Sequence, residues 1–300
     1  MINVYEQIDR NKRKSALVVV LFVIFVTLVV YIFSLTLEAS LSWIGVALIF
    51  AGLTSLGGYY WGDKVILAIS GARPATREKN FQFYTVVENL CLAAQIPKPK
   101  LYVIEDSAPN AFAAGRDPDH AVVCATSGLL NKLDRSELEG VIAHELSHIK
   151  NYDIRLMSIV TVLVGMVSLL ADWFMRSTYW GGRKRYRDKR GNLQAFLFIT
   201  AIFLALLSPL IARFIQLAIS RRREFLADAS AVMLTRYPEG LARALGKISA
   251  DRDPLEVANK ATAHLYIVNP LKGQKFVSWF ANLFNTHPPI KERIKTLKEM

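Results

Sequence analysis

The sequence predicts a mainly α-helical membrane protein with a cytoplasmic α+β domain that carries a small β-sheet. Two long uncharged runs, at residues 15–37 and 39–62, are the first observation behind this class. The second is composition, because 52% hydrophobic residues exceed the usual balance of a soluble domain. The third is the stretch 96–150, where short apolar runs alternate with turn residues and lead into a helix pattern.

Residues 1–62 form the predicted N-terminal transmembrane hairpin. The first run, 15–37, has 23 uncharged positions, more than the roughly 20 that cross a bilayer. A secretory signal peptide would have a shorter apolar region of about 7–15 residues and a small-residue cleavage site, which does not follow here. The second run, 39–62, has 24 positions and ends in two tyrosines and a tryptophan, a pattern typical of a membrane interface.

Basic residues at both outer ends of this hairpin predict its orientation. They are Lys12, Arg13 and Lys14 before the first run, and Lys64 and Arg73 after the second. Because basic residues next to membrane spans lie mostly on the cytoplasmic side, both ends are expected in the cytoplasm. The segment that follows, 63–155, is then expected there too, as the first part of the α+β domain.

Within this segment the pattern predicts one helix and a small sheet. Residues 76–95 have an apolar stripe at helical spacing, and two prolines soon end it. Residues 101–104 and 120–125 are typical of short strands. An exposed edge of such a sheet can pair with an extended peptide through backbone hydrogen bonds. Asn110 lies between the strands and has two interpretations, a turn residue or a functional one.

The stretch 144–148, His-Glu-Leu-Ser-His, carries the functional prediction. The serine and acids that precede it are typical of a helix start, so the stretch is expected on a helix. Positions four apart lie on one helix face, so His144 and His148 can bind one metal ion together. Glu145 lies beside them, where it can take a proton from a water on the metal. The alternative is a surface helix that carries these residues by chance.

Residues 156–212 form a predicted apolar hairpin, either transmembrane or membrane-embedded. Its uncharged runs, 156–171 and 191–212, flank a loop at 176–190 that has seven basic residues and one acid. If both runs cross, this loop lies on the outer side, against the positive-inside tendency. The alternative is a hairpin that dips into the bilayer or packs on the α+β domain. In either case the chain returns to the side it left.

Residues 213–300 form the predicted second part of the domain, and three arginines near its start are typical of a membrane-interface anchor. Glu224 can supply a third metal ligand, and Asp228, one turn on, can hold a ligating His through its other ring nitrogen. His287 precedes two prolines that fix its backbone, so it is either a group in the cleft or part of a helix-entry turn. His264 stands alone and is interpreted as structural.

Charge and cysteine content argue against a nucleic-acid-binding protein and against a cysteine-ligated metal site. Lys and Arg exceed Asp and Glu by 37 to 25, a net charge of +12, but no nucleic-acid-binding motif is present. Basic residues beside apolar helices indicate the anionic headgroups of a lipid bilayer instead. Cys91 and Cys124 lack the spacing of metal ligands and are expected to be buried free thiols.

Four ordered motifs resemble the HtpX proteases, membrane-integral zinc peptidases of family M48 that are related to the Ste24-type CAAX proteases. The motifs are residues 110–115, 144–151 with Asp153, 222–228 and 286–289, behind two leading apolar helices. The resemblance implies a zincin-type (gluzincin-like) metalloprotease domain with one Zn²⁺ per chain, and its three ligands would be His144, His148 and Glu224.

The same resemblance implies further roles. Glu145 would be the catalytic base, Asp228 would orient a zinc-ligating His, and His287 would steady the transition state. The substrate-binding edge would be formed by Asn110, Ala111 and Phe112.

The expected function is a membrane-bound zinc-dependent endopeptidase of the bacterial inner membrane, multi-pass, with its active site facing the cytoplasm. Its substrates would be proteins or peptides, chiefly misfolded or damaged membrane proteins, in quality control and the stress response. Two alternatives stay open: a Ste24-like processing peptidase for lipid-modified C-termini, and a zinc-stabilised membrane scaffold without turnover. The sequence leaves cleavage specificity and oligomeric state open.

Overall fold

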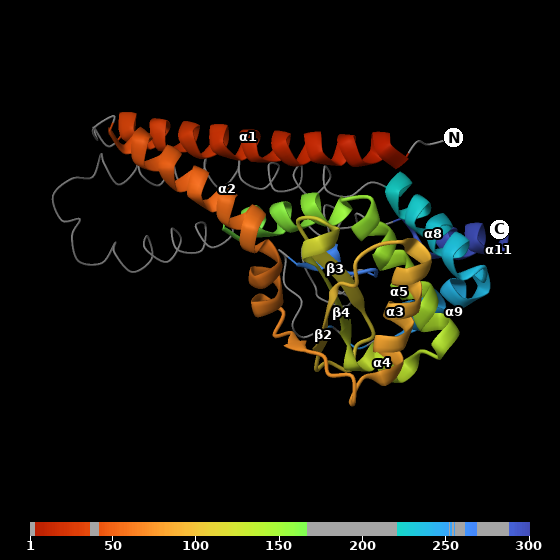
Figure 1. The fold of residues 1–300 in the computed structure, drawn as a ribbon. Coiled ribbons are helices and arrows are strands. Elements are labelled where there is room, and N and C mark those ends of the chain that lie inside the picture. The colour runs from red at the N-terminus through yellow and green to blue at the C-terminus, as the bar shows by residue number, and fades with distance from the viewer. Residues whose placement is uncertain are drawn as a thin grey trace.

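Two long helices, α1 (Val4–Thr36) and α2 (Ser42–Ile69), lie side by side and extend away from a body built on a small sheet (Figure 1). This computed structural model describes residues 4–36, 42–166, 221–251, 253, 255, 262–268 and 288–300. The apolar runs near the N-terminus are thus helical, as predicted. Within the described ranges, no helix has both the length and the apolar character needed to cross a bilayer. The membrane crossing of residues 15–37 and 39–62 therefore stays a prediction.

The body is built on a four-stranded mixed sheet with the order β1-β2-β4-β3. Its strands are β1 (Arg73–Pro74), β2 (Lys100–Ile104), β3 (Ala111–Gly115) and β4 (Ala121–Thr126). β2 and β4 pair in parallel, with Leu101 opposite Val123, and the outer strands pair antiparallel. β2 and β4 match the two predicted strands within a residue or two. β3 was not predicted, because its Ala-rich sequence has low intrinsic strand preference.

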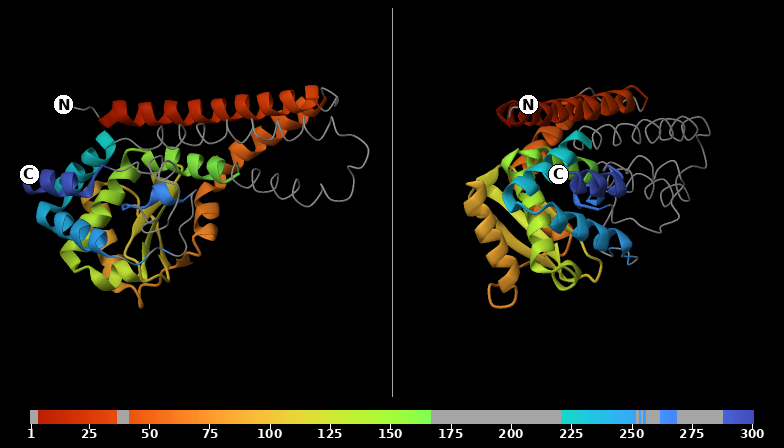
Figure 2. Two further views of the ribbon diagram at one scale, coloured as in Figure 1. Left: turned by 180° about the vertical axis from the view of Figure 1, so that it is seen from behind. Right: turned by 90° about the vertical axis from the view of Figure 1, so that its right-hand side faces the viewer.

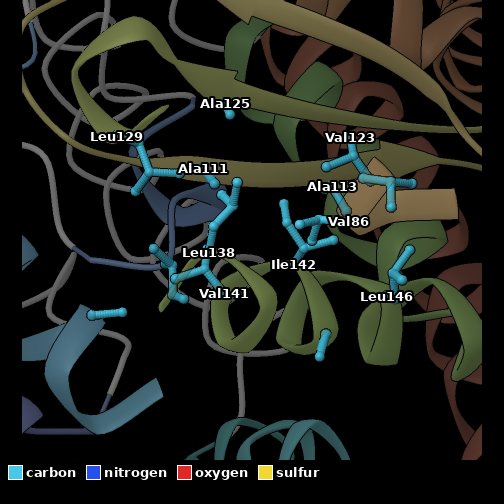
Figure 3. Close-up of a cluster of buried hydrophobic side chains, with 14 of the residues drawn as sticks. Val86, Ala111, Ala113, Val123, Ala125, Leu129, Leu138, Val141, Ile142 and Leu146 are labelled. Atoms are coloured by element: carbon cyan, nitrogen blue, oxygen red, sulfur yellow. The ribbon is translucent and has the colours of Figure 1, made fainter. Parts of the chain in front are cut away.

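Helices cover both faces of the sheet. The remaining described elements are α3 (Phe81–Ala94), η1 (Pro118–His120), α4 (Ser127–Lys132), α5 (Arg135–Lys150), α8 (Arg221–Thr235), α9 (Pro238–Ala250), η2 (Ala263–Leu265) and α11 (Ile290–Lys298). Alternate residues of β3 point to opposite faces, so Ala111 and Ala113 pack toward α5, as Figure 3 shows. Phe112 and Ala114 pack on the other face, against the end of α2. Burial on both faces explains why the strands are almost wholly apolar.

The helix α5 carries the stretch 144–148, and its start is fixed by a capping box. The Asp134 side chain accepts a hydrogen bond from the Glu137 backbone at 2.9 Å, and the Glu137 side chain accepts one from the Asp134 backbone. α5 packs along α3, α8 and α9, so it is buried on most sides. A helix in this position holds its side chains in fixed directions, as a metal site requires.

Gly140 lets α5 and α9 approach each other closely. A Cβ at this position would lie 2.7 Å from the Leu241 nitrogen and 2.8 Å from its Cα, which are backbone atoms. We expect Gly140→Ala to lower the free energy of unfolding by about 1–3 kcal/mol, because the two helices must separate. Gly246→Ala on α9 is the matched control, since nothing lies within 4 Å of its Cβ. It should be neutral or stabilising in thermal unfolding, and equal melting points for the two variants would contradict the close-packing argument.

The start of the third apolar run packs on the body. Residues 153–166 are helical, and Leu156, Val160 and Leu163 are fully buried. Ser158 accepts a hydrogen bond from the Gly115 backbone at 3.0 Å, which attaches this helix to β3. Packing on the domain was one of the alternatives for this run. The rest of the predicted hairpin, residues 167–212, lies outside the described residues.

The sheet edge formed by β3 is contacted by the chain itself, and its pairing with a peptide substrate stays a prediction. All five of its residues are buried, although β3 lies at the edge of the sheet. The Ala111 carbonyl accepts a hydrogen bond from Ile267 at 3.1 Å, so a distant part of the chain pairs with this edge. An edge strand leaves backbone groups that need partners, and the chain itself supplies one here. Cys91 and Cys124 are buried free thiols, as predicted.

Candidate metal centre

Two histidines of α5 face each other inside the body. His144 and His148 are 1% and 5% exposed, and their rings are nearly perpendicular with centroids 4.8 Å apart. Their Nε2 atoms lie 3.2 Å apart. The four-residue spacing gives this pair, because it brings both side chains to one face of the helix.

The third residue of the cluster comes from α8, which packs along α5. Glu224 is 3% exposed. Its carboxylate oxygens lie 3.8 Å from His144 Nε2 and 3.6 Å from His148 Nε2. One ligand atom from each of the three residues falls within 4.8 Å of the others. Segments far apart in sequence therefore meet at this point, as α5 and α8 do in both views of Figure 2.

A carboxylate fixes the outer nitrogen of each ring. Asp228 Oδ1 lies 2.9 Å from His144 Nδ1, and Asp153 Oδ2 lies 3.0 Å from His148 Nδ1. All four residues are at most 5% exposed. A carboxylate at this distance keeps the proton on Nδ1 and leaves Nε2 as a bare acceptor. Two acceptor nitrogens only 3.2 Å apart need a positive charge between them.

The pKa directions report the same demand for positive charge. Burial opposes the charge of His148, but the hydrogen bond to Asp153 and the nearby Glu224 together raise its pKa to about 9. For His144, burial dominates and lowers the pKa, despite the bond to Asp228. The two shifts run in opposite directions, because the bond to Asp153 and the charge of Glu224 outweigh burial at His148, whereas burial outweighs the bond to Asp228 at His144. A metal cation between the Nε2 atoms meets this demand in place of the proton.

The donor set fits a small divalent cation. Two nitrogens that bind at about 2.0–2.1 Å in tetrahedral geometry lie roughly 3.3 Å apart, close to the 3.2 Å between the two Nε2 atoms. The Glu224 oxygens are within a few tenths of an ångström of the separation that a third ligand needs. His144, His148 and Glu224 can therefore hold a metal ion.

Glu145 lies next to this cluster on α5 and is 2% exposed. Its negative charge contributes to raising the pKa values of both His148 and Arg293, so it is within electrostatic reach of the metal position. A carboxylate this deeply buried beside a cation site is suited to proton transfer.

Arg293 was not predicted as a site residue, yet it joins several parts of the cluster. It is fully buried and donates to Asp228 from Nε at 2.9 Å and from Nη2 at 2.7 Å. Its Nη1 lies 3.6 Å from Glu224 and donates to the Ile267 carbonyl at 3.2 Å. One signal could have identified it. Arg293 occupies a place in the apolar stripe of α11, between Ile290 and Leu297, where a surface arginine would not be expected.

The residues predicted to contact substrate are buried against another part of the chain. Asn110 is 4% exposed, and its side chain donates to the Val268 carbonyl at 2.9 Å. Phe112 is fully buried and meets the Tyr266 ring edge-on, with centroids 5.2 Å apart. Asn110, Ala111 and Phe112 are therefore all in contact with the chain at 266–268. The predicted cleft residue His287 and the basic loop 176–190 lie outside the described residues.

Comparison with known proteins gives matches along nearly the whole chain. The family model named peptidase family M48 matches residues 77–300. A relative named "Protease HtpX homolog" from Dictyoglomus thermophilum is 47% identical over 296 residues, which is 99% of this chain and 94% of the relative. A second of that name, from Thermoanaerobacter pseudethanolicus, is 45% identical over 298 residues, 99% of this chain and 97% of the relative. Among solved structures, S. mikatae Ste24p matches with a TM-score of 0.49 and 19% identity, over 90% of this chain and 62% of that one.

Proposed function

Because the chain belongs to peptidase family M48, we propose that it is a membrane-anchored zinc endopeptidase. The convergence of His144, His148 and Glu224 carries this proposal, since it supplies three metal ligands and leaves a fourth position for water and substrate. Protein or peptide substrates follow from the family. Zinc is the metal that suits a His₂Glu donor set with tetrahedral spacing.

The roles of the chain's own residues follow from their positions. Zinc bound there would lower the pKa of a coordinated water to about 7 and polarise the substrate carbonyl. Glu145 would take the proton of the attacking water and pass it to the leaving amine. Asp228 would hold His144 by its outer nitrogen, so that Nε2 stays directed at the metal position. His287, three positions before Ile290 at the start of α11, would contact the oxyanion.

Exposed apolar side chains support a membrane location for α1 and α2. Ile24 on α1 and Ile49 on α2 are 58% and 66% exposed. Further exposed apolar residues on the same two helices are Leu17, Val20, Leu28, Leu53, Leu56 and Trp61. Such a surface is favourable in lipid and costly in water. The proposal includes a bacterial inner-membrane hairpin over 1–62, with basic residues at its cytoplasmic end.

The catalytic domain of this proposal combines residues 63–155 with 213–300, and the apolar segment 156–212 lies between them. A cytoplasmic site beside a bilayer favours misfolded or damaged membrane proteins as substrates. A Ste24-like processing peptidase is the second candidate, and the position of the site next to the membrane helices favours it equally. The two candidates are separated by comparing the rates at which the protein cleaves a lipid-modified C-terminal peptide and an unfolded membrane protein. Faster cleavage of the peptide would favour the processing peptidase.

The experiment that tests the proposed function is removal of the third ligand. The parent protein, purified in detergent, should contain one zinc per chain and should hydrolyse an unfolded protein substrate. Glu224→Ala should lose both its zinc and its hydrolytic activity. Its zinc affinity should fall by more than the about 10- to 100-fold that follows loss of a residue hydrogen-bonded to a metal ligand. Glu292→Ala, an exposed acid on α11, is the control and should match the parent. If Glu224→Ala keeps its zinc and its activity, the proposed site is wrong.

A further inference from the structure

We propose that Asn11 of α1 is a positioning residue for the metal centre, which acts by holding Asp153 against the metal-ligating His148. The proposal rests on the proposed zinc site. It goes beyond that site because it makes metal retention depend on the N-terminal helix, which otherwise has only an anchoring role. The N-terminal end of α1 lies near α8, as Figure 2 shows in both views.

Asn11 is buried against the turn that follows α5. It is 1% exposed, and its Nδ2 donates to Asp153 Oδ1 at 2.7 Å and to the Asn151 carbonyl at 2.9 Å. Its Oδ1 accepts a hydrogen bond from Arg223 Nη1 at 3.3 Å. The side-chain amide therefore uses both of its donors and its acceptor, as a buried amide must if its burial is not to cost stability.

Asp153 connects this amide to the metal position. Its Oδ1 accepts hydrogen bonds from Asn11 Nδ2 and from Arg223 Nη1, the second at 2.9 Å. Its Oδ2 lies 3.0 Å from His148 Nδ1. Arg223 directly precedes Glu224 on α8. The network thus touches both helices that supply metal ligands. A carboxylate held on one oxygen by two donors has its other oxygen fixed in direction, and this oxygen orients His148.

Two neighbouring residues of α1 make contacts of a different kind. Ser15, one turn on, is 4% exposed, and its hydroxyl donates only to the Asn11 carbonyl of its own helix, at 2.9 Å. Lys12 lies 4.9 Å from the centre of the Tyr152 ring, which attaches α1 to the same turn without contact to Asp153. These two residues separate the effect of docking α1 from the effect of holding Asp153.

The test measures zinc affinity in the full chain in detergent, by competition with a chelator of known affinity. Asn11→Ala removes the amide. Asn11→Leu keeps roughly the size of the side chain but offers Asp153 no donor and Arg223 no acceptor. Both variants should raise the zinc dissociation constant about 10-fold, the lower range for loss of an outer-shell partner. Ser15→Ala and Lys12→Ala should bind zinc as the parent does, and melting points of the metal-free proteins should be recorded beside each value.

Two results would overturn the inference while leaving the proposed function intact. In the first, the parent binds zinc and both Asn11 variants bind it with equal affinity. In the second, Lys12→Ala or Ser15→Ala weakens zinc binding as much as Asn11→Ala does, so that docking of α1 and not the contact with Asp153 sets the affinity. A parent that binds no zinc would overturn the proposed function itself, and the inference with it.

Discussion

Glu145→Gln is expected to lower the rate of peptide hydrolysis by about 10²- to 10⁴-fold, the range for loss of a general acid–base group. Gln has the size of Glu but cannot accept the proton of the attacking water. Glu145 does not belong to the three-residue metal cluster, so the variant should keep one zinc per chain. The measurements are kcat and KM on an unfolded protein substrate, with metal content determined on the same sample.

The matched control is Glu139→Gln on the same helix, at a partly exposed acid that pairs with Arg135 at 3.0 Å. This variant should retain parental activity. If Glu145→Gln hydrolyses substrate like the parent, the assignment of the base is wrong. The scaffold alternative would be supported over the peptidase if the parent binds one zinc per chain but cleaves neither an unfolded protein nor a lipid-modified peptide.

Arg293→Ala is expected to lower the free energy of unfolding by about 3–5 kcal/mol, because it leaves the carboxylate of Asp228 buried without its cation. Asp228 is 1% exposed, and Arg293 donates to both of its oxygens. The substitution should also disturb the metal centre, because Asp228 contacts His144 Nδ1. Chemical or thermal unfolding of the metal-free protein measures the stability term without the contribution of bound zinc.

A second substitution tests the reason for this loss. Adding Asp228→Asn to Arg293→Ala removes the unpaired charge, so the double variant should be more stable than Arg293→Ala alone. Lys295→Ala on the same helix, whose side chain is 79% exposed, should unfold like the parent. A loss in Arg293→Ala no larger than in Lys295→Ala would contradict the role of the buried pair.

The metal cluster was predictable because its residues have a pattern that geometry dictates. His144 and His148 are four positions apart on one helix, and this spacing alone brings both rings to one side. Glu224 and Asp228 have the same spacing on a second helix. The two strands at 100–104 and 121–126 were predictable from runs of β-branched and apolar residues.

The rest depends on contacts between distant segments, which no local pattern reports. The place of Arg293 in the apolar stripe of α11 signals its burial, but its partner Asp228 lies 65 positions away and no local pattern identifies it. Asn11 precedes an apolar run and has no local feature that points to Asp153, from which it is separated by 142 positions. The burial of β3 likewise depends on residues 266–268, which pair with it from far along the chain.

The distance between the two sides of the metal centre also has a consequence during synthesis. His144 and Arg293 are 149 positions apart. At about 5–20 residues per second, a ribosome needs roughly 7–30 s to translate that interval. A growing chain that already exposes both histidines has no Glu224 or Arg293 to complete the cage around them. If His144, His148 and Glu224 hold the metal as proposed, a nascent copy acquires peptidase activity only after the helices that carry Glu224 and Arg293 have emerged and docked.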